Sequence, residues 1–379
     1  MTAGDAGAGA PFRAAYGREP DVVWRCPGRV NLIGDHTDHQ GGLALPLAID
    51  RYVTVAVARR ADGVVRVRSA DFPHEVRGPV SERPESGGWA AYVLGAAWLL
   101  HRRGAPGDGA DVFVSSTVPV GAGLSSSAAV TCASVRALAD LSGVRLDLAE
   151  VARVAQQVET DVVGAPVGLL DQTAVLFAAA GTALLLDFAT GGRETVPLPG
   201  DPWRLVVVDT RVSHAHAGGE YADRRRLLDE ARQRLAVASL SDLGPADVDR
   251  DRGALGSAYR AVRHVVTEND RVRRTADALR RRNFREVGAL MVQSHESLRD
   301  DLEVSCPELD LAVGVALDAG AAGARMTGGG FGGSAIVLAT SDVGEQLTSA
   351  LDRAFAAAGF AAPAAFPVAA VDGARLLTD

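Results

Sequence analysis

Alternating apolar and polar positions mark several predicted strands along the chain. Residues 52–58 and 64–69 alternate with a period of two, as half-buried strands do, and residues 61–63 (ADG) between them predict a turn. Residues 203–210, WRLVVVDT, are instead continuously apolar at their centre, which is typical of a fully buried strand. A further strand is predicted at residues 334–339, directly after a glycine-rich loop. The pattern therefore predicts strands in both halves of the chain.

Apolar residues that recur every three to four positions predict helices elsewhere. These helices are expected at residues 89–102, 128–141, 221–238 and 241–300. Asp147 and Glu150 have the spacing of a helix-capping pair, so another helix is predicted from there onward. Glu159 lies at the edge of the apolar side of that helix, where a carboxylate is equally consistent with a salt bridge and with a metal ligand.

A change in composition divides the chain. Residues 191–202, GGRETVPLPGDP, are rich in glycine and proline and separate two regions of regular pattern. We therefore expect two domains, 1–195 and 196–379, which a chain of 379 residues is long enough to support. Residues 1–20 are rich in alanine and glycine and are expected to be loosely held.

Composition and charge exclude several classes of protein. The formal net charge is −8, which argues against non-specific nucleic-acid binding because such binding needs a basic surface. The three cysteines have no CxxC spacing, so neither a disulfide framework nor a zinc site is predicted. The first residues lack the positive charge and apolar core of a secretory signal, and no apolar run approaches the about 20 residues that span a bilayer. We therefore expect a cytoplasmic protein without nucleic-acid or membrane partners.

The chain contains no lysine, so all 39 of its lysine-plus-arginine positions are arginine. This excludes a Walker-A lysine, the ATP-binding lysine of protein kinases, and Schiff-base chemistry, including the attachment of pyridoxal phosphate. The G-x-S-x-G and H-E-x-x-H motifs are absent as well, so the usual markers of serine hydrolases and zinc proteases are missing.

The segment TVPVGAGLSSSAA, residues 117–129, has the composition of an anion-binding loop. Gly121 and Gly123 let main-chain N–H groups approach a ligand closely, and a predicted helix begins directly afterwards. The N-terminus of a helix presents unpaired N–H donors to an anion. Small hydroxyl groups are added there by Ser125, Ser126 and Ser127. An ordinary strand-to-helix turn is the alternative interpretation of this segment.

Charged residues also lie among apolar ones at two places, where they are costly to bury unless they are paired or used in chemistry. Asp171 interrupts the apolar segment 164–188. The other group lies within residues 22–42 and comprises Arg29, Asp35, His36, Asp38 and His39. A solvated loop with a surface ion pair is the alternative for that group, and a metal site formed by HTDH is a weaker one because its spacing fits no common zinc pattern.

Aromatic and glycine residues leave two further features open. Trp89 and Tyr92 lie near one face of the predicted helix 89–102, where core packing is the simplest explanation. Five glycines within residues 328–333 precede a predicted strand, and they form either a second wall of an anion site or a tight entry into the strand.

Three motifs in this order resemble those of the GHMP small-molecule kinases: PGRVNLIGDHTDH at residues 27–39, PVGAGLSSSAA at 119–129 and RMTGGGFGG at 325–333. The first is similar to the galactokinase signature, and GLLDQ (168–172) and SHESLRDDLEVSCPELD (294–310) extend the similarity over nearly the whole chain. The resemblance implies an α+β, two-domain fold with a ribosomal-protein-S5-like N-terminal domain and a second α+β domain. It also implies an active site in the interdomain cleft, with ATP as the phosphoryl donor.

Matched residue by residue, the resemblance implies that Asp171 and Arg29 are the catalytic pair. Asp171 would take or orient the proton of the anomeric hydroxyl group, while Arg29 would favour its ionised form and stabilise charge on the transferring phosphoryl group. Mg²⁺ would be held by Glu159 and by Ser127, with Ser126 as the alternative hydroxyl ligand. The implied ATP-binding positions are Trp89, Tyr92, Pro119, Gly121, Gly123, Leu124, Ser125, Ser126 and Ser127.

The positions that the resemblance implies for the sugar are Arg29, Asp35, His36, Asp38, Gly168, Asp171 and Tyr221. Three residues depart from the usual family pattern, because Asp35 replaces a glutamate, His39 a tyrosine and Gln40 an asparagine. The acid at the position of Asp35 would reach the 6-hydroxyl of the sugar, so its shorter side chain implies extra space beyond C6. A uronate would need a cation there, for which His36 or His39 is the only nearby candidate.

The leading hypothesis is an ATP- and Mg²⁺-dependent galactokinase that makes galactose 1-phosphate. The alternative is an anomeric kinase for a C6-modified or elongated galacto-configured sugar, such as galacturonate, a heptose or an octose. A non-catalytic sugar sensor on the same fold is disfavoured because the serine-rich loop, Arg29 and Asp171 are all present. The expected partners are the sugar and ATP, and the expected assembly is a monomer or a weak homo-oligomer.

Overall fold

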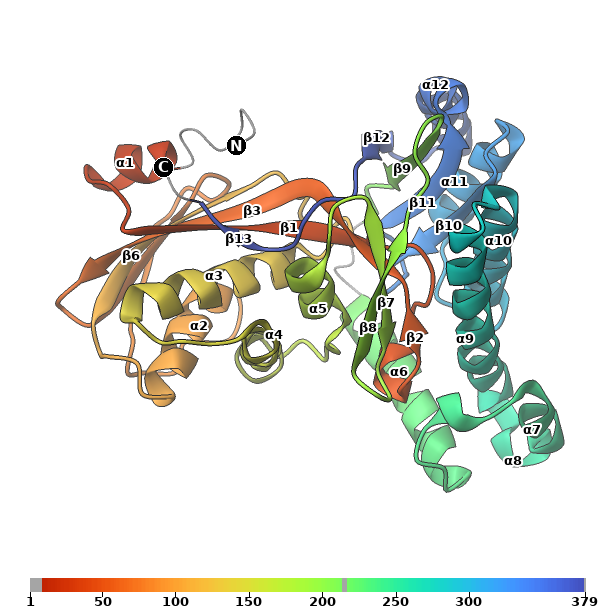
Figure 1. Ribbon diagram of the computed structural model, residues 1–379, viewed down its shortest axis with the longest axis horizontal. Helices are drawn as coiled ribbons and strands as arrows, with labels where there is room; N and C mark the ends of the chain where they lie inside the picture. The colour runs from red at the N-terminus through yellow and green to blue at the C-terminus, as the bar shows by residue number, and fades with distance from the viewer. Residues whose placement is uncertain (1–8, 213–216, 378–379) are drawn as a thin grey trace.

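The computed structural model describes residues 9–212 and 217–377 of the chain. Its N-terminal half is built on a six-stranded sheet in the order β13-β1-β3-β6-β4-β5, at the left of Figure 1. The strands are β1 (Val22–Asn31), β3 (Pro46–Arg60), β4 (Val64–Ser69), β5 (Val76–Pro79), β6 (Gly109–Ser116) and β13 (Arg375–Leu376).

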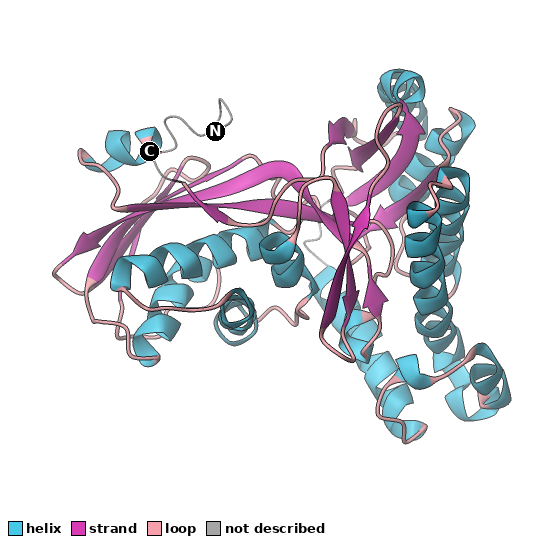
Figure 2. Ribbon diagram, viewed as in Figure 1, coloured by secondary structure: helices cyan, strands magenta, loops and turns pink. Residues whose placement is uncertain are grey.

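Helices cover one face of this sheet, as Figure 2 shows. They are α2 (Ala91–Arg102), α3 (Ser126–Ser142), α4 (Leu148–Gln157) and α5 (Leu170–Phe177). The alternation predicted for β3 has its cause here: Val53, Val55 and Val57 pack into the large core beneath these helices. Ala56 and Ala58 point to the other face, where they pack with α1 (Ala10–Tyr16).

The predicted strands β3 and β4 exist, but they do not pair with each other. Strand β6 lies between them, antiparallel to β3 and parallel to β4. The turn between β3 and β4 is present, yet the pattern of each strand records only which of its faces is buried, and it does not identify the neighbour.

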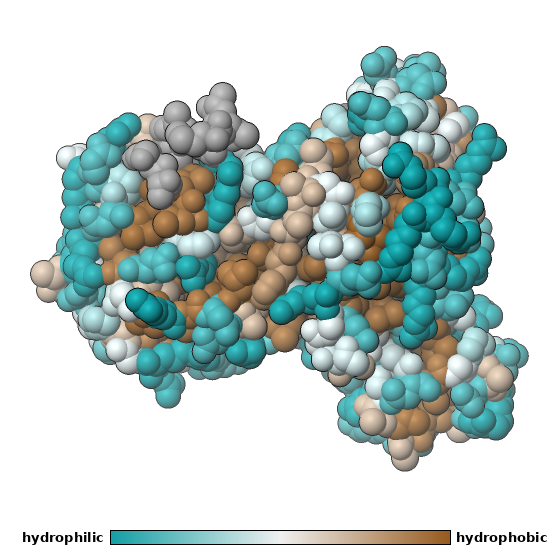
Figure 3. All heavy atoms as spheres, viewed as in Figure 1, coloured by the Kyte–Doolittle hydropathy of each residue, from teal (hydrophilic) through white to brown (hydrophobic). Residues whose placement is uncertain are grey.

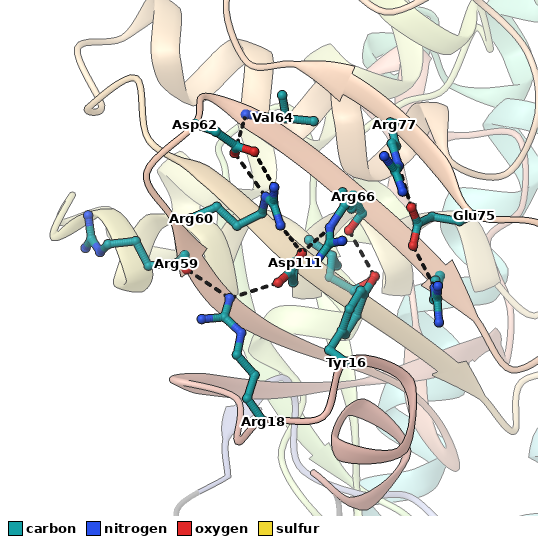
Figure 4. A network of polar contacts seen from close by, with 12 residues as sticks. Tyr16, Arg18, Arg59, Arg60, Asp62, Val64, Arg66, Glu75, Arg77 and Asp111 are labelled. Atoms are coloured by element: carbon teal, nitrogen blue, oxygen red, sulfur yellow. Dashed lines mark hydrogen bonds and ion pairs between the residues drawn. The ribbon is translucent and has the colours of Figure 1, made fainter.

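Residues 10–16 form helix α1, contrary to the expectation of a loosely held N-terminal segment, whose first eight residues lie outside the described part. Figure 4 shows how the end of α1 and the residues after it are held: Tyr16 donates to the carbonyl of Arg66 at 3.2 Å, and Arg18 donates to Asp111 at 2.9 Å. Arg60 also bonds the carboxylate of Asp111, which is only 2% exposed. Burial alone would raise the pKa of Asp111, but the hydrogen bond from Arg66 and the charges of the neighbouring arginines lower it.

A small second sheet, in the order β2-β7-β8, joins the two halves. Its strands are β2 (Leu43–Ala44), β7 (Thr182–Asp187) and β8 (Gly192–Pro197). The predicted domain boundary at residues 195 and 196 falls inside β8, and β13 returns from the C-terminal end of the chain to pair with β1. The division into domains 1–195 and 196–379 stays a prediction.

The C-terminal half contains a four-stranded sheet in the order β10-β11-β9-β12, with its own hydrophobic core. Its strands are β9 (Trp203–Asp209), β10 (Gly323–Thr327), β11 (Ser334–Thr340) and β12 (Ala364–Val368). Its helices are α6 (Ala217–Arg234), α7 (Pro245–Arg250), α8 (Arg252–Leu255), α9 (Tyr259–Arg280), α10 (Phe284–Asp300), α11 (Pro307–Asp318) and α12 (Ser341–Ala358). Figure 3 shows hydrophilic residues over the outer surface of α9 and α10, as expected for amphipathic helices that cover a core.

Helix α4 begins at the predicted capping pair, since the N–H of Glu150 donates to Asp147 at 2.7 Å and the N–H of Asp147 donates to Glu150 at 2.8 Å. The helix then widens into a π-helix, η2 (Val158–Val163), which the apolar spacing did not predict. Glu159 lies in this π-helix and is 1% exposed, so the carboxylate expected at the edge of the apolar stripe is fully buried. π-helical turns often occur at functional sites.

Candidate active site

An ion pair between Arg29 and Asp171 lies where the first and second predicted motifs meet. Arg29 leaves the end of β1, and its Nε and Nη2 atoms donate to Asp171 Oδ1 at 2.9 and 2.5 Å. Its remaining nitrogen, Nη1, donates to the carbonyl oxygen of Gly123 at 2.7 Å. One buried guanidinium group therefore fixes both the acid at the start of α5 and the glycine-rich loop.

The glycine-rich loop turns sharply before α3. Gly121 and Gly123 have φ values of 79° and 74°, and Ser125 also has a left-handed φ of 58°. This conformation turns the hydroxyl of Ser125 toward Asp171 Oδ2, to which it donates at 2.6 Å. Ser125 therefore contacts the acid, a contact that the sequence did not predict, while Ser126 and Ser127 form the first turn of α3.

All seven residues predicted for the sugar line one cavity of about 220 Å³: Arg29, Asp35, His36, Asp38, Gly168, Asp171 and Tyr221. Gly168 lies against Asp38, since a Cβ atom at residue 168 would lie 1.9 Å from Asp38 Oδ2 and would force that side chain to move. Burial alone would raise the pKa of Asp38, but its hydrogen bond and charge interaction with His39 lower it. The pocket therefore presents an ionised acid close to the main chain of residue 168.

His36 is a neutral group in this pocket. Burial lowers its pKa to about 3, and the nearby His39 and His264 act in the same direction. Nε2 of His36 lies 3.1 Å from the carbonyl oxygen of Gly329, which can only accept, so the ring carries its proton on Nε2. Nδ1 is buried without a partner among the described residues, and it can accept a hydrogen bond from a hydroxyl group.

Asp35 has a cationic partner that the sequence analysis missed. Arg325, which is 0% exposed, donates from Nη2 to Asp35 Oδ2 at 2.5 Å, and the N–H of Gly328 donates to Oδ1 at 3.1 Å. The expectation that only His36 or His39 supplies a cation near this end of the pocket is therefore wrong. Arg325 is the first residue of the third motif, RMTGGGFGG, directly before the segment that contains its five glycines.

Burial raises the pKa of Asp35 despite the opposing charge of Arg325. Arg325 also donates to the carbonyl oxygen of Asn31 at 3.1 Å, and Thr327 and Asn31 exchange two hydrogen bonds between the same two segments. These hydrogen bonds join the third motif to the first.

Glu159 and Ser127, the predicted metal ligands, lie close together behind the loop. Burial raises the pKa of Glu159 to about 7, against hydrogen bonds from Gln172 and Ser127 that lower it. Gln172 Nε2 donates to Glu159 Oε1 at 2.7 Å, while Gln172 Oε1 is a buried acceptor without a partner among the described residues. No group of three or more acidic, histidine or cysteine side chains that could hold a metal occurs in the described part of the chain.

The predicted aromatic residues Trp89 and Tyr92 line a second cavity of about 140 Å³, together with Ser126 and Ser127. Phe72, which the sequence analysis did not consider, stacks on Trp89 with ring centroids 5.1 Å apart and planes 5° from parallel. This cavity and the first lie on either side of the loop, because Ser126 lines one and the adjacent Ser125 bonds Asp171 in the other. A flat aromatic wall beside the start of a helix suits a nucleotide base and its phosphates.

Two further predicted ATP-binding positions in the loop are Leu124 and Pro119. Leu124 is 1% exposed, so its side chain belongs to the core and only its main chain is available to a ligand. Its carbonyl oxygen accepts from the N–H of Arg29 at 3.1 Å. Pro119 lies in the loop that precedes Gly121, and Val120 beside it is 70% exposed.

Comparison with protein families identifies three signatures in the chain. They are the galactokinase galactose-binding signature at residues 10–59, the GHMP kinase N-terminal domain at 91–179 and the GHMP kinase C-terminal region at 275–357. The chain is 46% identical to a galactokinase of Streptomyces coelicolor over 377 residues, which is 97% of each chain. It is 40% identical to a galactokinase of Bos taurus over 338 residues, which is 86% of each chain.

The fold also matches the crystal structure of Lactococcus lactis galactokinase complexed with galactose, with a TM-score of 0.92 and 30% identity over 97% of this chain and 98% of that one. The two-domain α+β architecture and the loop between two pockets define the protein as a GHMP kinase. Within that class, the chain belongs to the galactokinase family. No helix in the described part of the chain has the length and hydrophobicity needed to span a bilayer.

Proposed function

We propose that this protein transfers the γ-phosphoryl group of ATP to the C1 hydroxyl of D-galactose, giving galactose 1-phosphate and ADP. The observation that carries the proposal is the Arg29–Asp171 ion pair, which lies beside the loop that separates the two pockets. The relatives described as galactokinases, one of them solved with galactose, support the choice of sugar.

In the proposed reaction, the C1 oxygen forms a bond to the γ-phosphorus atom as the bond from that atom to ADP breaks, and ADP keeps the electron pair. Asp171 accepts the proton of the C1 hydroxyl on Oδ2, because Arg29 occupies Oδ1. The hydrogen bond from Ser125 to Oδ2 fixes the direction in which that oxygen faces. Positioning and neutralisation of charge supply most of the acceleration in phosphoryl transfer.

The main chain of residues 119–127 and the N-terminus of α3 would bind the ATP phosphates in place of a lysine, with the base in the cavity lined by Phe72, Trp89 and Tyr92. Mg²⁺ fits beside Ser127 and Glu159, where hydroxyl and carboxylate oxygens and the unpartnered Oε1 of Gln172 suit a hard cation that also binds water and phosphate. When bound, the ion would neutralise charge on the phosphates.

The alternative of a C6-charged sugar loses support from the pairing of the cations. Among the described residues around the sugar pocket, Arg29 is paired with Asp171 and Arg325 with Asp35, and burial keeps His36 neutral. A uronate would add a second negative charge beside Asp35, whose own cation, Arg325, is already paired with it. The shorter Asp35 still leaves elongated neutral sugars as the second candidate.

The test is release of ADP from ATP with galactose, galacturonate, and neutral heptose and octose analogues of galactose. We expect galactose to give the highest kcat/KM and galacturonate to give none. A neutral elongated sugar that exceeds galactose tenfold would establish the second candidate, and absence of ADP release with every sugar would overturn the proposal. We also propose a cytoplasmic location and a monomeric or weakly associating chain, for which light scattering in solution is the test of assembly.

A further inference from the structure

Helix α6 carries three side chains that contact the segments from which the sugar pocket is built. They are Tyr221, Arg225 and Asp229, and their spacing of four residues places them one above another on the helix. We call this set the α6 face. Only Tyr221 was predicted from the sequence to take part in binding.

The three contacts are made with two segments of the chain: residues 36–40, at the end of the first motif, and Pro166, just before Gly168. The ring of Tyr221 lies 5.2 Å from the ring of His36, centroid to centroid. Arg225 Nη1 donates to the carbonyl oxygen of Pro166 at 3.0 Å, two residues before Gly168. Asp229 Oδ1 accepts from Gln40 Nε2 at 2.9 Å.

Gln40 explains one departure from the family pattern noted in the sequence. It is 1% exposed, and its side chain reaches α6 without lining the sugar cavity. Its carbonyl oxygen accepts hydrogen bonds from the hydroxyl groups of Ser239 and Ser241, which follow α6 in the chain. Gln40 therefore joins the end of the first motif to α6 and to the segment after it.

Helix α6 has little core of its own, so its polar contacts contribute much to its position; Arg224 also bonds Glu303, and Arg234 bonds the carbonyl oxygen of Leu255. Leu228 and Ala231 are the only buried side chains among its described residues, and most of the rest are polar. The first motif, by contrast, is also held by α9, which contacts it through His264 and Glu268. Figure 1 shows α6 near the junction of the two halves of the molecule.

We propose that Arg225 and Gln40 are positioning residues that set the affinity for the sugar by holding Tyr221 against His36 at the pocket wall. Neither residue touches the reacting atoms. The proposal rests on the proposed sugar-kinase function and adds to it residues that determine sugar binding. It also explains why position 40 is a glutamine: this side chain reaches Asp229, whereas the side chain of an asparagine is one methylene group shorter.

The experiment compares wild type with Gln40→Asn, Arg225→Met and the double variant Gln40→Asn/Asp229→Glu, in which the added methylene restores the combined length. Arg226→Met is the matched control, because Arg226 is the adjacent arginine and is exposed. Galactose affinity is measured by titration calorimetry without ATP, KM and kcat by ADP release, and the mobility of α6 by hydrogen exchange.

Loss of one hydrogen bond should weaken galactose binding and raise its KM about five- to tenfold in Gln40→Asn and Arg225→Met. The KM for ATP and kcat should stay within about twofold of wild type, exchange of the α6 amides should accelerate, and the double variant should recover most of the affinity. Arg226→Met should match wild type in every measurement.

Unchanged sugar affinity in Arg225→Met and Gln40→Asn, equal increases in both KM values, or unchanged exchange of α6 would each overturn the proposal. If Gln40→Asn does not fold, the surface variant Arg225→Met alone decides. Failure of the wild type to phosphorylate any sugar would refute the proposed function instead, while calorimetry and hydrogen exchange would still test the α6 face.

Discussion

Asp171 is held from two sides by groups that come from different motifs. Arg29 bonds Oδ1 twice and Ser125 bonds Oδ2, with no distance above 2.9 Å. The carboxylate therefore has one orientation, and the remaining lone pair on Oδ2 is the position that can accept a proton from a substrate. Geometry of this kind is needed when a general base contributes to catalysis by position.

Replacement of Asp171 by asparagine tests this arrangement. The amide keeps the shape of the side chain but cannot accept the proton, so kcat should fall by about 10³-fold. ATP binding, measured by calorimetry, should remain near the wild-type value because the nucleotide pocket is untouched. Full activity in Asp171→Asn would contradict the role assigned to this residue.

Motif similarity predicted which residues gather around the sugar, but it did not predict how they pair. Arg29 and Asp171 were expected together, whereas the hydrogen bond from Ser125, an expected ATP-binding residue, to Asp171 was not. Arg325 was missed because its partner, Asp35, is 290 residues away in the sequence. Periodicity describes which face of an element is buried, and it carries no information on such distant partners.

The Arg325–Asp35 pair leads to a prediction about stability. Arg325→Met would leave Asp35 buried without its cation, so we expect the free energy of unfolding to fall by about 3–5 kcal/mol in urea denaturation. The double variant Arg325→Met/Asp35→Leu removes both charges and should recover most of that loss. A single variant as stable as wild type would show that the pair is not a structural contact.

At the scale of elements, α9 holds the first motif from behind the pocket. His264 bonds the carbonyl oxygen of Asp35, Glu268 accepts from the N–H of Gly34, and Asn269 accepts from the N–H of Leu43. Glu268 also bonds Ser294 on α10 at 2.5 Å and Arg271 on its own helix at 2.7 Å. The buried carboxylate of Glu268 therefore links α9 and α10 to the first motif.

The stability of the protein is predicted to depend on the ionisation of Glu268. Burial alone would raise the pKa of Glu268, but the charges of Arg271, His264 and Arg325 lower it to about 2. The folded-state pKa lies below the ordinary value, so its contribution to stability is present above about pH 4.5 and is lost as the pH falls toward 2.

In Glu268→Gln this part of the acid dependence should disappear, and the protein should be less stable at neutral pH by about 3 kcal/mol or more. Urea denaturation at a series of pH values measures both effects. Asp270→Asn is the control on the same helix, because the ion pair of Asp270 with Arg274 is exposed and its loss should change stability by less than about 1 kcal/mol. Parallel pH profiles for wild type and Glu268→Gln would refute the assignment.

The type of an element was easier to predict from the sequence than the elements with which it pairs. The strand at residues 64–69 and the capping pair Asp147–Glu150 agree with the structure, because alternation and capping are local properties. The insertion of β6 between β3 and β4 is not local, since it depends on how strands from different parts of the chain share one sheet. The π-helix at Glu159 also has no counterpart in the apolar spacing.

At the scale of the whole molecule, three motifs that are distant in the sequence meet through direct hydrogen bonds. Gly328 bonds Asp35, and Ser334 donates to the carbonyl oxygen of Ala122 in the glycine-rich loop at 2.7 Å. The family resemblance implied that the motifs converge, and close approach explains some of their glycines. A Cβ atom at Gly330, for example, would lie 2.2 Å from the carbonyl oxygen of Val304.

Residues near the C-terminal end of the chain pack on the N-terminal half. The predicted domain boundary near residue 195 assigns these residues to the other domain. Beyond β12, the N–H of Gly373 bonds Ala178 at 2.9 Å and the N–H of Ala374 bonds Val175 at 2.9 Å, so this segment packs on α5, the helix that carries Asp171. A Cβ atom at Gly373 would lie 2.4 Å from the carbonyl oxygen of Leu176. The two halves should therefore unfold together.

Gly373→Ala should displace this segment from α5, lower the free energy of unfolding by about 1–3 kcal/mol and reduce kcat, because Asp171 lies on the displaced helix. Gly253→Ala is the matched control: Gly253 lies in α8 with open space around its Cα, so alanine should be neutral or slightly stabilising there. Thermal unfolding followed by calorimetry should give a single transition in all three proteins. A Gly373→Ala variant with unchanged stability and kcat would show that the C-terminal segment does not support the catalytic helix.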